Sequence, residues 1–498
     1  MRNSFLIGSL VSVVVLTILI LWQPNLWWVA VLLLPVYILG FKDYFQKADN
    51  IQRNYPLFGR LTNLLEEQRH VLQEALFLNR TEGMPFNWIQ KEIVYKRAAN
   101  ANKNQPFGTQ LSYESVGRER FLHSTFPSKE FRDNFRINIG GPNCTKPYSS
   151  SILNLGAMSY GSISKNATLA LNAGAKIANF AQNTGEGGLT PYHRKYKADL
   201  IFQFGTGYFG CRNKEGDFDA KKFKKIAEDK LVKMIEIKIS QGAKPGFGAI
   251  LPASKNTREI SEYRDIEAHT EIHSPAHHSA FSNPNELLKF IKELRDLSSA
   301  KPIGIKLCIG LKLEFDEMIE IFSKNKENNF PDFIAVDGAE GGSGAASMDG
   351  LHWGGTPLIE ALHFVDITLK KYNLRKHIKV IAAGKIISSF DIYKALAVGA
   401  DACYSARGMM FALGCVQSLK CNLNTCPTGI TTMDSKRVKA LVVEDKKHKV
   451  ANYHKNTIQG LKELLLSMGI SDRNGINKTS IVRKISESDS KSYSELYK

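Results

Sequence analysis

Apolar residues near the N-terminus form two uninterrupted stretches that predict a helical hairpin. Residues 5–22 and 26–41 carry no charge, and the turn sequence Gln23-Pro24-Asn25 separates them. Each stretch is close to the lower length limit for a membrane-spanning helix. Tryptophans surround the turn, where interfacial aromatic residues are common. We therefore expect a transmembrane hairpin over residues 1–44.

The basic residues predict how the hairpin is oriented. Arg2 precedes the first stretch, Lys42 and Lys47 follow the second, and the turn has no Lys or Arg, so both ends should be cytoplasmic. The alternatives are a signal peptide and a buried hydrophobic hairpin. A signal peptide is disfavoured because its apolar part would be too long and no small-x-small cleavage site is evident. We expect the main body of the chain on the cytoplasmic face of the plasma membrane.

Beyond residue 150, short β-rich runs alternate with helical patterns, which predicts an α/β protein. The expected strands are Ile152–Leu155, Ile177–Phe180, Ile201–Phe204, Met234–Ile239, Ile303–Ile309, Phe333–Val336, Ile378–Ala382 and Ala402–Tyr404. The expected helices are Lys165–Ala175, Ala220–Leu231, Asn285–Leu297, Glu314–Lys324, Leu358–Lys371 and Phe390–Ala397. Eight strands with intervening helices favour a (β/α)8 TIM barrel over 151–470, and a doubly wound sheet is the alternative.

The segments on either side of the barrel are less regular. Residues 45–150 are expected to form a mixed connecting region, with a helix over Thr62–Leu78. The polar tail 471–498 is expected to be loosely ordered. Lys and Arg together number 66 against 48 Asp and Glu, a net charge of +18. This excess suits a nucleic acid, acidic substrates or an anionic leaflet, and beside the hairpin it predicts membrane lipid rather than nucleic acid.

Candidate chemistry gathers at the carboxyl ends of the expected strands, where barrel enzymes carry their active sites. Glu186 follows the second strand among glycines, a poor place for core packing and a good one for a positioned acid. Lys238 and Lys306 lie within strands, where a lysine is costly unless it meets an anion. A Gly-rich turn follows the sixth strand and is the best phosphate or cofactor cradle. Candidate cofactor residues there and in later loops are Asp337, Gly338, Gly341, Gly342, Gly344, Gly384 and Gly408.

Converging lysines and glycines at one barrel mouth suit a flat phosphorylated cofactor such as FMN. Taken singly, a glycine-rich turn is usually only a turn, and a strand lysine can pair with a structural carboxylate.

Three cysteines give the sharpest signal in the sequence. Cys415, Cys421 and Cys426 have the spacing C-x5-C-x4-C, which suits a soft metal or an iron–sulfur cluster. Three ligands without an obvious fourth favour a three-iron cluster over zinc, with Cys403 as a possible fourth ligand. The alternatives are three buried thiols, or Cys426 as a nucleophile.

Several motifs, in order, resemble the FMN-binding synthase domain of glutamate synthase over residues 150–470. They are Gly156-Ala157-Met158-Ser159, Asn183–Gly188, Ile237–Gly246, Ser274-Pro275 with His277-His278, and Cys421–Pro427. The whole chain is similar to the stand-alone, membrane-anchored glutamate-synthase-like proteins of bacteria.

The resemblance implies a role for each matching residue. Cys415, Cys421 and Cys426 would ligate a [3Fe-4S] cluster, and Lys238, Gln241 and Lys244 would hold 2-oxoglutarate or its imine. Glu186 would shape the substrate pocket and manage protons. Residues expected around FMN are Met158, Ser159, Lys306, Gly342, Gly344 and Gly408. The implied reaction adds ammonia to 2-oxoglutarate and reduces the 2-iminoglutarate to L-glutamate, with electrons from ferredoxin or a membrane carrier.

Two departures from the family pattern bear on the expected chemistry. The N-terminal 150 residues are too short for a glutaminase domain, and no second GxGxxG region follows the barrel, so neither glutamine hydrolysis nor direct NADPH oxidation is expected. Gly246-Phe247-Gly248-Ala249 and Ala382-Ala383-Gly384-Lys385 each lack an acidic residue and paired glycines usual in the family. The alternatives are a related amino-group or N-methyl transfer on glutamate, and a non-catalytic membrane-tethered interaction protein.

Overall fold

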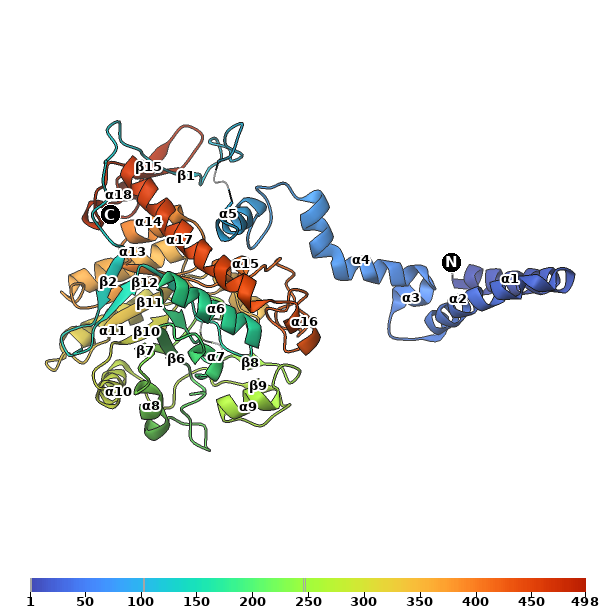
Figure 1. Ribbon diagram of the computed structural model, residues 1–498, viewed down its shortest axis with the longest axis horizontal. Helices are drawn as coiled ribbons and strands as arrows, with labels where there is room; N and C mark the ends of the chain where they lie inside the picture. Colours follow the sequence, from blue (N-terminus) through green and yellow to red (C-terminus); the bar gives the residue numbers. More distant parts are fainter. Residues whose placement is uncertain (1, 102–103, 245, 247) are drawn as a thin grey trace. The chain divides into compact units, whose positions relative to one another are not determined.

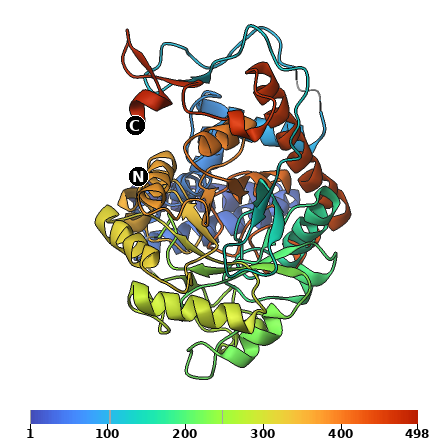
Figure 2. The ribbon, with the colours of Figure 1, turned by 90° about the vertical axis from the view of Figure 1, so that its left-hand side faces the viewer.

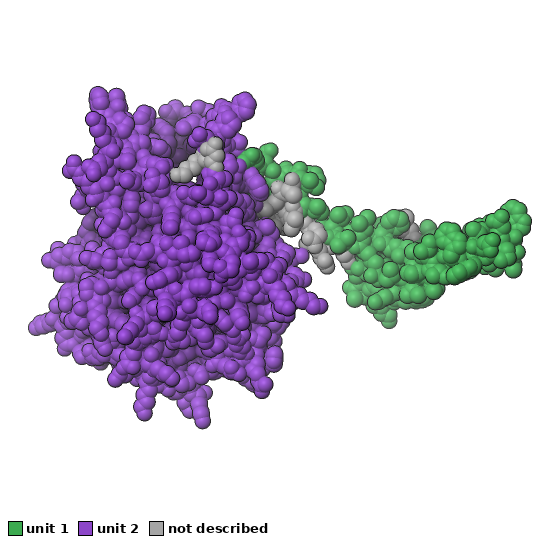
Figure 3. All heavy atoms as spheres, viewed as in Figure 1, with its two compact units in different colours: residues 1–83 green, residues 84–498 purple. Residues whose placement is uncertain are grey.

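The computed structural model describes residues 2–101, 104–244, 246 and 248–498. Contacts divide the chain into two compact units, residues 1–83 and residues 84–498 (Figure 3). Pro245 and Phe247, which belong to the motifs quoted above, lie outside the described residues.

The first unit begins with two antiparallel apolar helices. Helix α1 (Arg2–Trp22) and helix α2 (Trp27–Phe45) are joined by the 3-10 turn η1 (Pro24–Leu26). Both helices are long and apolar enough to cross a membrane, with mean hydropathies of 2.7 and 1.7. The Ser12 hydroxyl lies 2.7 Å from the Tyr37 hydroxyl, which links the two helices. The hairpin expected from the sequence therefore forms.

An ion pair with a buried carboxylate connects α2 with the helices that follow it. Helices α3 (Asn50–Asn54) and α4 (Phe58–Leu72) lead into the π-helical turn η2 (Gln73–Phe77), which together cover the helix expected over Thr62–Leu78. Asp43 is fully buried and accepts hydrogen bonds from the Arg60 guanidinium at 2.6 and 2.8 Å. Such a bidentate pair fixes the relative orientation of the two side chains and also pairs their charges.

The second unit is built on a closed parallel barrel of eight strands, so the (β/α)8 prediction is confirmed and the doubly wound alternative is excluded. The helices form the outer layer around the strands (Figures 1 and 2). The strands, in chain order, are β4 (Leu153–Leu155), β5 (Gln182–Asn183), β6 (Leu200–Phe204), β7 (Val232–Lys238), β10 (Ile303–Leu307), β11 (Phe333–Asp337), β12 (Lys379–Ala383) and β13 (Ala402–Ser405).

The crossover helices follow the apolar periodicity closely. Those outside the barrel are α6 (Lys165–Ala178), α8 (Ala220–Ala227), α10 (Pro284–Leu297), α11 (Lys312–Ser323), α13 (Leu358–Lys371) and α14 (Ser389–Ala397). Many of them start at a side-chain cap, such as Ser164 for α6 and Asn283 for α10. Each cap satisfies a backbone N–H that has no partner within the helix.

The expected second strand was wrong, because Ile177 and Ala178 belong to α6. Asn179 ends that helix in a left-handed conformation, with φ of 54°. The strand lies a few residues later and consists of two polar residues, Gln182 and Asn183. Both side chains are buried against other polar groups, since Gln182 accepts from Asn172 and Asn183 donates to Glu236. An apolar pattern therefore cannot reveal this strand.

The loops of the barrel carry shorter elements. They are α7 (Pro191–Arg194), β8 (Ile250–Leu251), α9 (Arg258–Arg264), β9 (Ile272–His273), α12 (Met348–Trp353), α15 (Arg407–Ala412) and α16 (Ser435–Lys439). At the amino ends of the strands, β2 (Arg136–Ile139) pairs with β3 (Tyr148–Ser151). Ile139 and Tyr148 of this hairpin pack against the apolar side chains inside the barrel. The hairpin therefore closes the end of the barrel opposite the expected site.

Two helices brace one side of the barrel. Helix α17 (Val443–Ser467) lies along α6 and also contacts α5 (Trp88–Ala98). Arg97 of α5 donates hydrogen bonds to Thr457 of α17 and to Ser389 of α14. Helix α5 thus belongs structurally to the barrel unit, although it precedes the barrel by many residues.

The C-terminal tail is folded, contrary to our expectation. Strand β14 (Ile481–Lys484) pairs with β1 (Glu119–Phe121) and β15 (Ser490–Ser492), and α18 (Tyr493–Leu496) follows. Ile481 and Tyr493 are fully buried, and Arg483 pairs with Glu119 at 2.7 Å. A few apolar side chains and one distant carboxylate therefore order a segment whose composition is polar.

Candidate active site at the carboxyl mouth of the barrel

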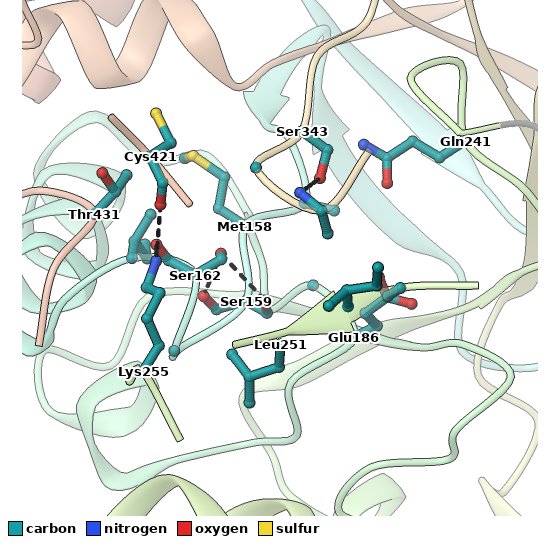
Figure 4. Close-up of a pocket in the computed structure, with 18 of the residues that line it drawn as sticks. Met158, Ser159, Ser162, Glu186, Gln241, Leu251, Lys255, Ser343, Cys421 and Thr431 are labelled. Carbon is teal, nitrogen blue, oxygen red and sulfur yellow. Dashed lines mark hydrogen bonds between the residues drawn. The ribbon is translucent and has the colours of Figure 1, made fainter. Parts of the chain in front are cut away.

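A pocket opens at the carboxyl ends of the strands, where the sequence placed the candidate chemistry. Predicted residues that line this pocket are Met158, Ser159, Glu186, Lys238, Gln241, Lys306, Gly344 and Cys421. Figure 4 shows several of them around the cavity. Predicted residues outside the lining are Lys244, Asp337, Gly338, Gly341, Gly342, Gly384, Gly408, Cys415 and Cys426.

Glu186 is the carboxylate with which two buried lysines of the site pair. Its Oε1 accepts hydrogen bonds from Lys238 Nζ at 2.5 Å and from Lys244 Nζ at 3.4 Å. Both lysines are almost fully buried, with side chains 8% and 3% exposed. A Cβ at position 205 would lie 2.4 Å from Glu186 Oε2, so Gly205 is needed for the carboxylate to lie here.

The mutual fields of these groups shift their pKa values. Burial by itself would raise the pKa of Glu186, but Lys238 and Lys244 hold it well below its ordinary value. Burial lowers the pKa of Lys238 to about 8, and the positive charges of Lys244 and Lys306 add to this, against the opposing effect of Glu186. The carboxyl is therefore ionised at neutral pH, and the Lys238 ammonium can give up a proton near pH 8.

A buried hydrogen-bond network holds the loop of Glu186 from below. Glu236 of β7 points into the barrel and accepts from Asn183 at 2.9 Å and from Tyr404 at 3.0 Å. The Asn183 amide oxygen accepts from the backbone N–H of Gly185 at 3.0 Å. Buried hydrogen-bond networks whose polar groups are all paired are rigid, so the backbone that carries Glu186 is held in place.

A second ion pair links two neighbouring strands of the barrel, β10 and β11. Lys306 of β10 lies beside Lys238 in the strand register, and its Nζ is 3.6 Å from Asp337 Oδ1. Asp337 Oδ2 accepts from the backbone N–H of Gly242 at 2.9 Å. A Cβ on Gly242 would lie 1.8 Å from the Gly338 carbonyl oxygen, so only glycine permits this approach.

The remaining predicted glycines lie around the loops after β11, β12 and β13. The Gly338 N–H donates to Ala383 O at 2.7 Å, which ties the loop of β11 to β12, and Gly341 N–H donates back to Gly338 O. Gly384 lies against Gly338, and Gly342 lies against the Arg407 guanidinium. Gly408 packs against Tyr453 and Ser405. Gly344 lies against the backbone of Cys421, so this loop meets the cysteine loop.

The three cysteines lie on the loop after α15, and all are free thiols. Cys421 Sγ is 3.8 Å from Arg407 Nη1, and Cys426 Sγ is 3.3 Å from the Thr428 hydroxyl. Burial raises the pKa of Cys415 to about 11, and the negative charges of the other two cysteines add to this. For Cys426, burial is outweighed by hydrogen bonds from Thr428 and Thr431, so its pKa is lowered.

The three thiols share one loop, but among the described residues they do not form a preassembled site for a single metal ion. Within the described ranges, no three Cys, His, Asp or Glu side chains converge closely enough to hold one metal ion. Cys403 is fully buried on β13 in the layer between strands and helices, with Leu461 and Ile392 among that cluster. Its position does not join it to the loop that carries Cys415, Cys421 and Cys426.

The structure adds two buried cations that sequence reasoning missed. Arg264 of α9 lines the pocket and donates to Tyr160 O at 2.8 Å. Lys255 also lines the pocket and donates to Ser162 O at 3.0 Å and to Cys421 O at 3.1 Å, as Figure 4 shows. Burial lowers the pKa of Arg264 to about 10 and that of Lys255 to about 8. Both belong to the long loop after β7, where nothing in the sequence signals burial.

Comparison with known proteins agrees with the fold and the motifs. Residues 120–471 match the conserved region of glutamate synthase. The glutamate synthase large subunit-like protein YerD of Bacillus subtilis is 35% identical, over 91% of this chain and 94% of that protein. The archaeal-type glutamate synthase [NADPH] of Thermotoga neapolitana is 35% identical over 63% of this chain.

The archaeal-type relatives extend beyond the matched region. The chain covers 59% of the Thermotoga protein and 58% of the archaeal glutamate synthase [NADPH] of Methanocaldococcus jannaschii, which is 35% identical over the aligned residues. The YerD protein, in contrast, is matched over nearly its whole length. The chain belongs to the glutamate synthase family and is an oxidoreductase of that family.

Proposed function

We propose that the chain forms L-glutamate by reductive amination of 2-oxoglutarate with ammonia, while tethered to a membrane. The observation that carries the proposal is the convergence of buried cations around Glu186 at the barrel mouth. A dicarboxylate substrate needs at least two cationic partners, and this pocket has Lys238 and Arg264 in its lining with Lys244 directly behind. Gln241 adds an amide beside them.

The protonation states suggest a division of labour between these groups. Glu186 is ionised and so holds the two lysines in place rather than donating a proton. Ammonia adds to the keto carbon to give a carbinolamine, and Lys238 is suited to protonate the carbinolamine hydroxyl so that it leaves as water and the imine forms, because its pKa of about 8 lies near operating pH. Arg264 lines the pocket and would bind a substrate carboxylate, while Lys244, paired with Glu186, would add positive charge beside the pocket.

Other residues of the same pocket suit FMN. Met158, Ser159 and Gly344 line the cavity with small or unbranched side chains, which leave room for a flat ring. Arg407, next to Gly342, offers a cation for the phosphate of FMN. Lys306 and Gly408 complete the residues that we expect to hold it. Reduced FMN would supply the hydride that turns 2-iminoglutarate into L-glutamate.

The thiol loop suits an iron–sulfur cluster better than a single metal ion. Its donors are three free cysteines and no histidine, the donor set that iron–sulfur clusters use. We propose that Cys415, Cys421 and Cys426 hold a [3Fe-4S] cluster, which would pass electrons singly toward the flavin.

The apolar hairpin α1–α2 would fix the enzyme to the cytoplasmic face of a membrane. There the net charge of +18 would be compatible with an anionic leaflet. The immediate electron donor would be a ferredoxin or a membrane-bound carrier.

The test uses the full chain, purified without oxygen in detergent. We expect FMN and about three irons per chain, and 2-oxoglutarate with ammonia should reoxidise the reduced flavin and yield L-glutamate. Methylamine in place of ammonia tests the N-methyl alternative. Reduced, flavin-loaded protein that does not turn over with ammonia would overturn glutamate formation. A preparation that takes up neither FMN nor iron would favour the non-catalytic alternative.

A further inference from the structure

Lys255 is a buried ammonium group without a carboxylate partner among the described residues. It is 3% exposed, and its Nζ is hydrogen-bonded to two backbone carbonyls, those of Ser162 and Cys421. The other buried lysines of the pocket differ, because Lys238 and Lys244 pair with Glu186 and Lys306 pairs with Asp337. A buried cation of this kind needs a nearby anion to offset its lost hydration.

The cysteine loop lies directly against the Lys255 ammonium, because Lys255 Nζ donates to the Cys421 carbonyl oxygen at 3.1 Å and both residues line the pocket. Cys421 and Cys426 favour the charged form of Lys255, whereas Arg264 opposes it. Lys255 is therefore placed to balance negative charge held on this loop.

The backbone around Lys255 fixes it against the same loop. Its N–H donates to Pro252 O in a tight turn, and the Asn424 side chain donates to the Ser254 carbonyl at 2.8 Å. Asn256 anchors the far side of the turn by donating to Glu267 O and Thr270 O. Several hydrogen bonds therefore hold the Lys255 ammonium against the cysteine loop.

We propose that Lys255 is the countercation of the iron–sulfur cluster and raises its reduction potential; this inference rests on the cluster proposed above. One electron that enters the cluster makes it more negative by one charge, and a fixed neighbouring cation stabilises that reduced state. Two unit charges about 10 Å apart in a medium of effective dielectric about 20 interact strongly enough to change an equilibrium constant roughly tenfold. Through Ser162, the same ammonium also touches the loop that we expect to face the flavin.

Three variants separate charge from hydrogen bonding. Lys255→Gln keeps a donor and removes the charge, Lys255→Met removes both, and Lys255→Arg keeps both. The matched control is Lys301→Gln, because Lys301 also donates to two backbone carbonyls, those of Ala227 and Asp229, at 2.5 and 2.9 Å. Lys301 immediately precedes β10 at the amino end of the strands, on the side away from the cysteine loop.

The readout is the midpoint potential of the cluster, followed by its EPR signal in a mediated titration of the full chain without substrate. We expect Lys255→Gln and Lys255→Met to make reduction about tenfold less favourable, a fall of about 59 mV for one electron. Lys255→Arg and Lys301→Gln should stay within about twofold of the unmodified protein. Loss of iron in Lys255→Gln with full iron in Lys255→Arg would equally support a countercation.

Two results would overturn the inference, and only the second would also overturn the proposed iron–sulfur cluster. If the cluster forms and Lys255→Gln leaves the potential within about twofold, or if Lys255→Arg behaves like Lys255→Gln, charge is not the role of Lys255. If the unmodified chain holds no iron after anaerobic reconstitution, the proposed cluster fails together with this inference. FMN content, measured in the same samples, shows whether the pocket itself is intact.

Discussion

At the residue scale, Glu186 and Lys238 determine the expected pH dependence of the reaction. The Lys238 ammonium has a pKa of about 8, so the rate should fall as pH rises through that value. Because the charge of Glu186 raises the pKa of Lys238, Glu186→Gln should move this descending limb to lower pH. The measurement is the pH profile of flavin reoxidation by 2-oxoglutarate and ammonia. An unchanged limb in Glu186→Gln would assign the proton to another group.

Lys244 supplies a separate residue-scale prediction. We expect Lys244→Ala to raise the KM for 2-oxoglutarate about tenfold, because it removes a positive charge beside the pocket, and two unit charges about 10 Å apart at an effective dielectric of about 20 interact by about 1.7 kcal/mol. FMN affinity should change much less, since Lys244 lies behind Glu186 and not in the pocket lining. Flavin content and KM are measured on the same preparation. Equal losses of both would mean that the substitution unfolds the mouth of the barrel.

The cysteine loop is tested at one thiol. We expect Cys421→Ser to lose most of its iron, because a serine hydroxyl is a poor soft-metal ligand. The matched control is Cys403→Ser, on β13 and away from the loop, which should keep its iron. Iron analysis and EPR measure both variants. Full iron in Cys421→Ser would show that the ligand assignment is wrong.

At the element scale, the C-terminal strands support the barrel unit. Tyr493 is fully buried, and Arg483 donates to its hydroxyl at 3.1 Å. We expect Tyr493→Ala to destabilise this unit by about 3 kcal/mol, as truncation of a buried aromatic side chain commonly does. The exposed Ser490→Ala is the control. The measurement is the thermal midpoint together with proteolysis near residue 480, and equal midpoints for the two variants would contradict a structural tail.

A correctly predicted helix and a missed strand show when apolar periodicity predicts secondary structure. The helix over Leu358–Lys371 was predicted to the residue, since its apolar face repeats at helical spacing against the barrel. Strand β5 was missed because its two residues, Gln182 and Asn183, satisfy polar partners inside the barrel. Periodicity reports burial against apolar neighbours only, so a strand with buried polar side chains escapes it.

At the scale of the whole molecule, the hairpin should decide where the enzyme is found. We expect the full chain in the membrane fraction, resistant to salt washing, because two apolar helices bury far more surface than a peripheral contact. A variant that lacks residues 1–44 should appear in the soluble fraction with its flavin. Fractionation followed by flavin assay is the measurement. Release of the full chain by salt alone would contradict a spanning hairpin.

The sequence by itself determined the barrel, the hairpin and the identity of much of the site. Strand–helix alternation, charge-free apolar stretches and cysteine spacing are local patterns, and each has a direct physical cause in burial or ligand chemistry. Lys238, Lys306 and Glu186 could be recognised because a charged side chain in a barrel strand, or in a glycine-rich loop at its end, costs free energy unless it meets an opposite charge or a ligand. These signals need no knowledge of what lies across the barrel.

Only the tertiary structure decided which charges meet. Lys244 was expected to bind substrate, yet it lies behind Glu186, and Asp337 pairs with Lys306 and Gly242 instead of facing the pocket. Lys255 and Arg264 look like ordinary loop residues until the fold buries them. Pairing and burial depend on groups distant in sequence, since the free energy of a charge is set by its surroundings in space.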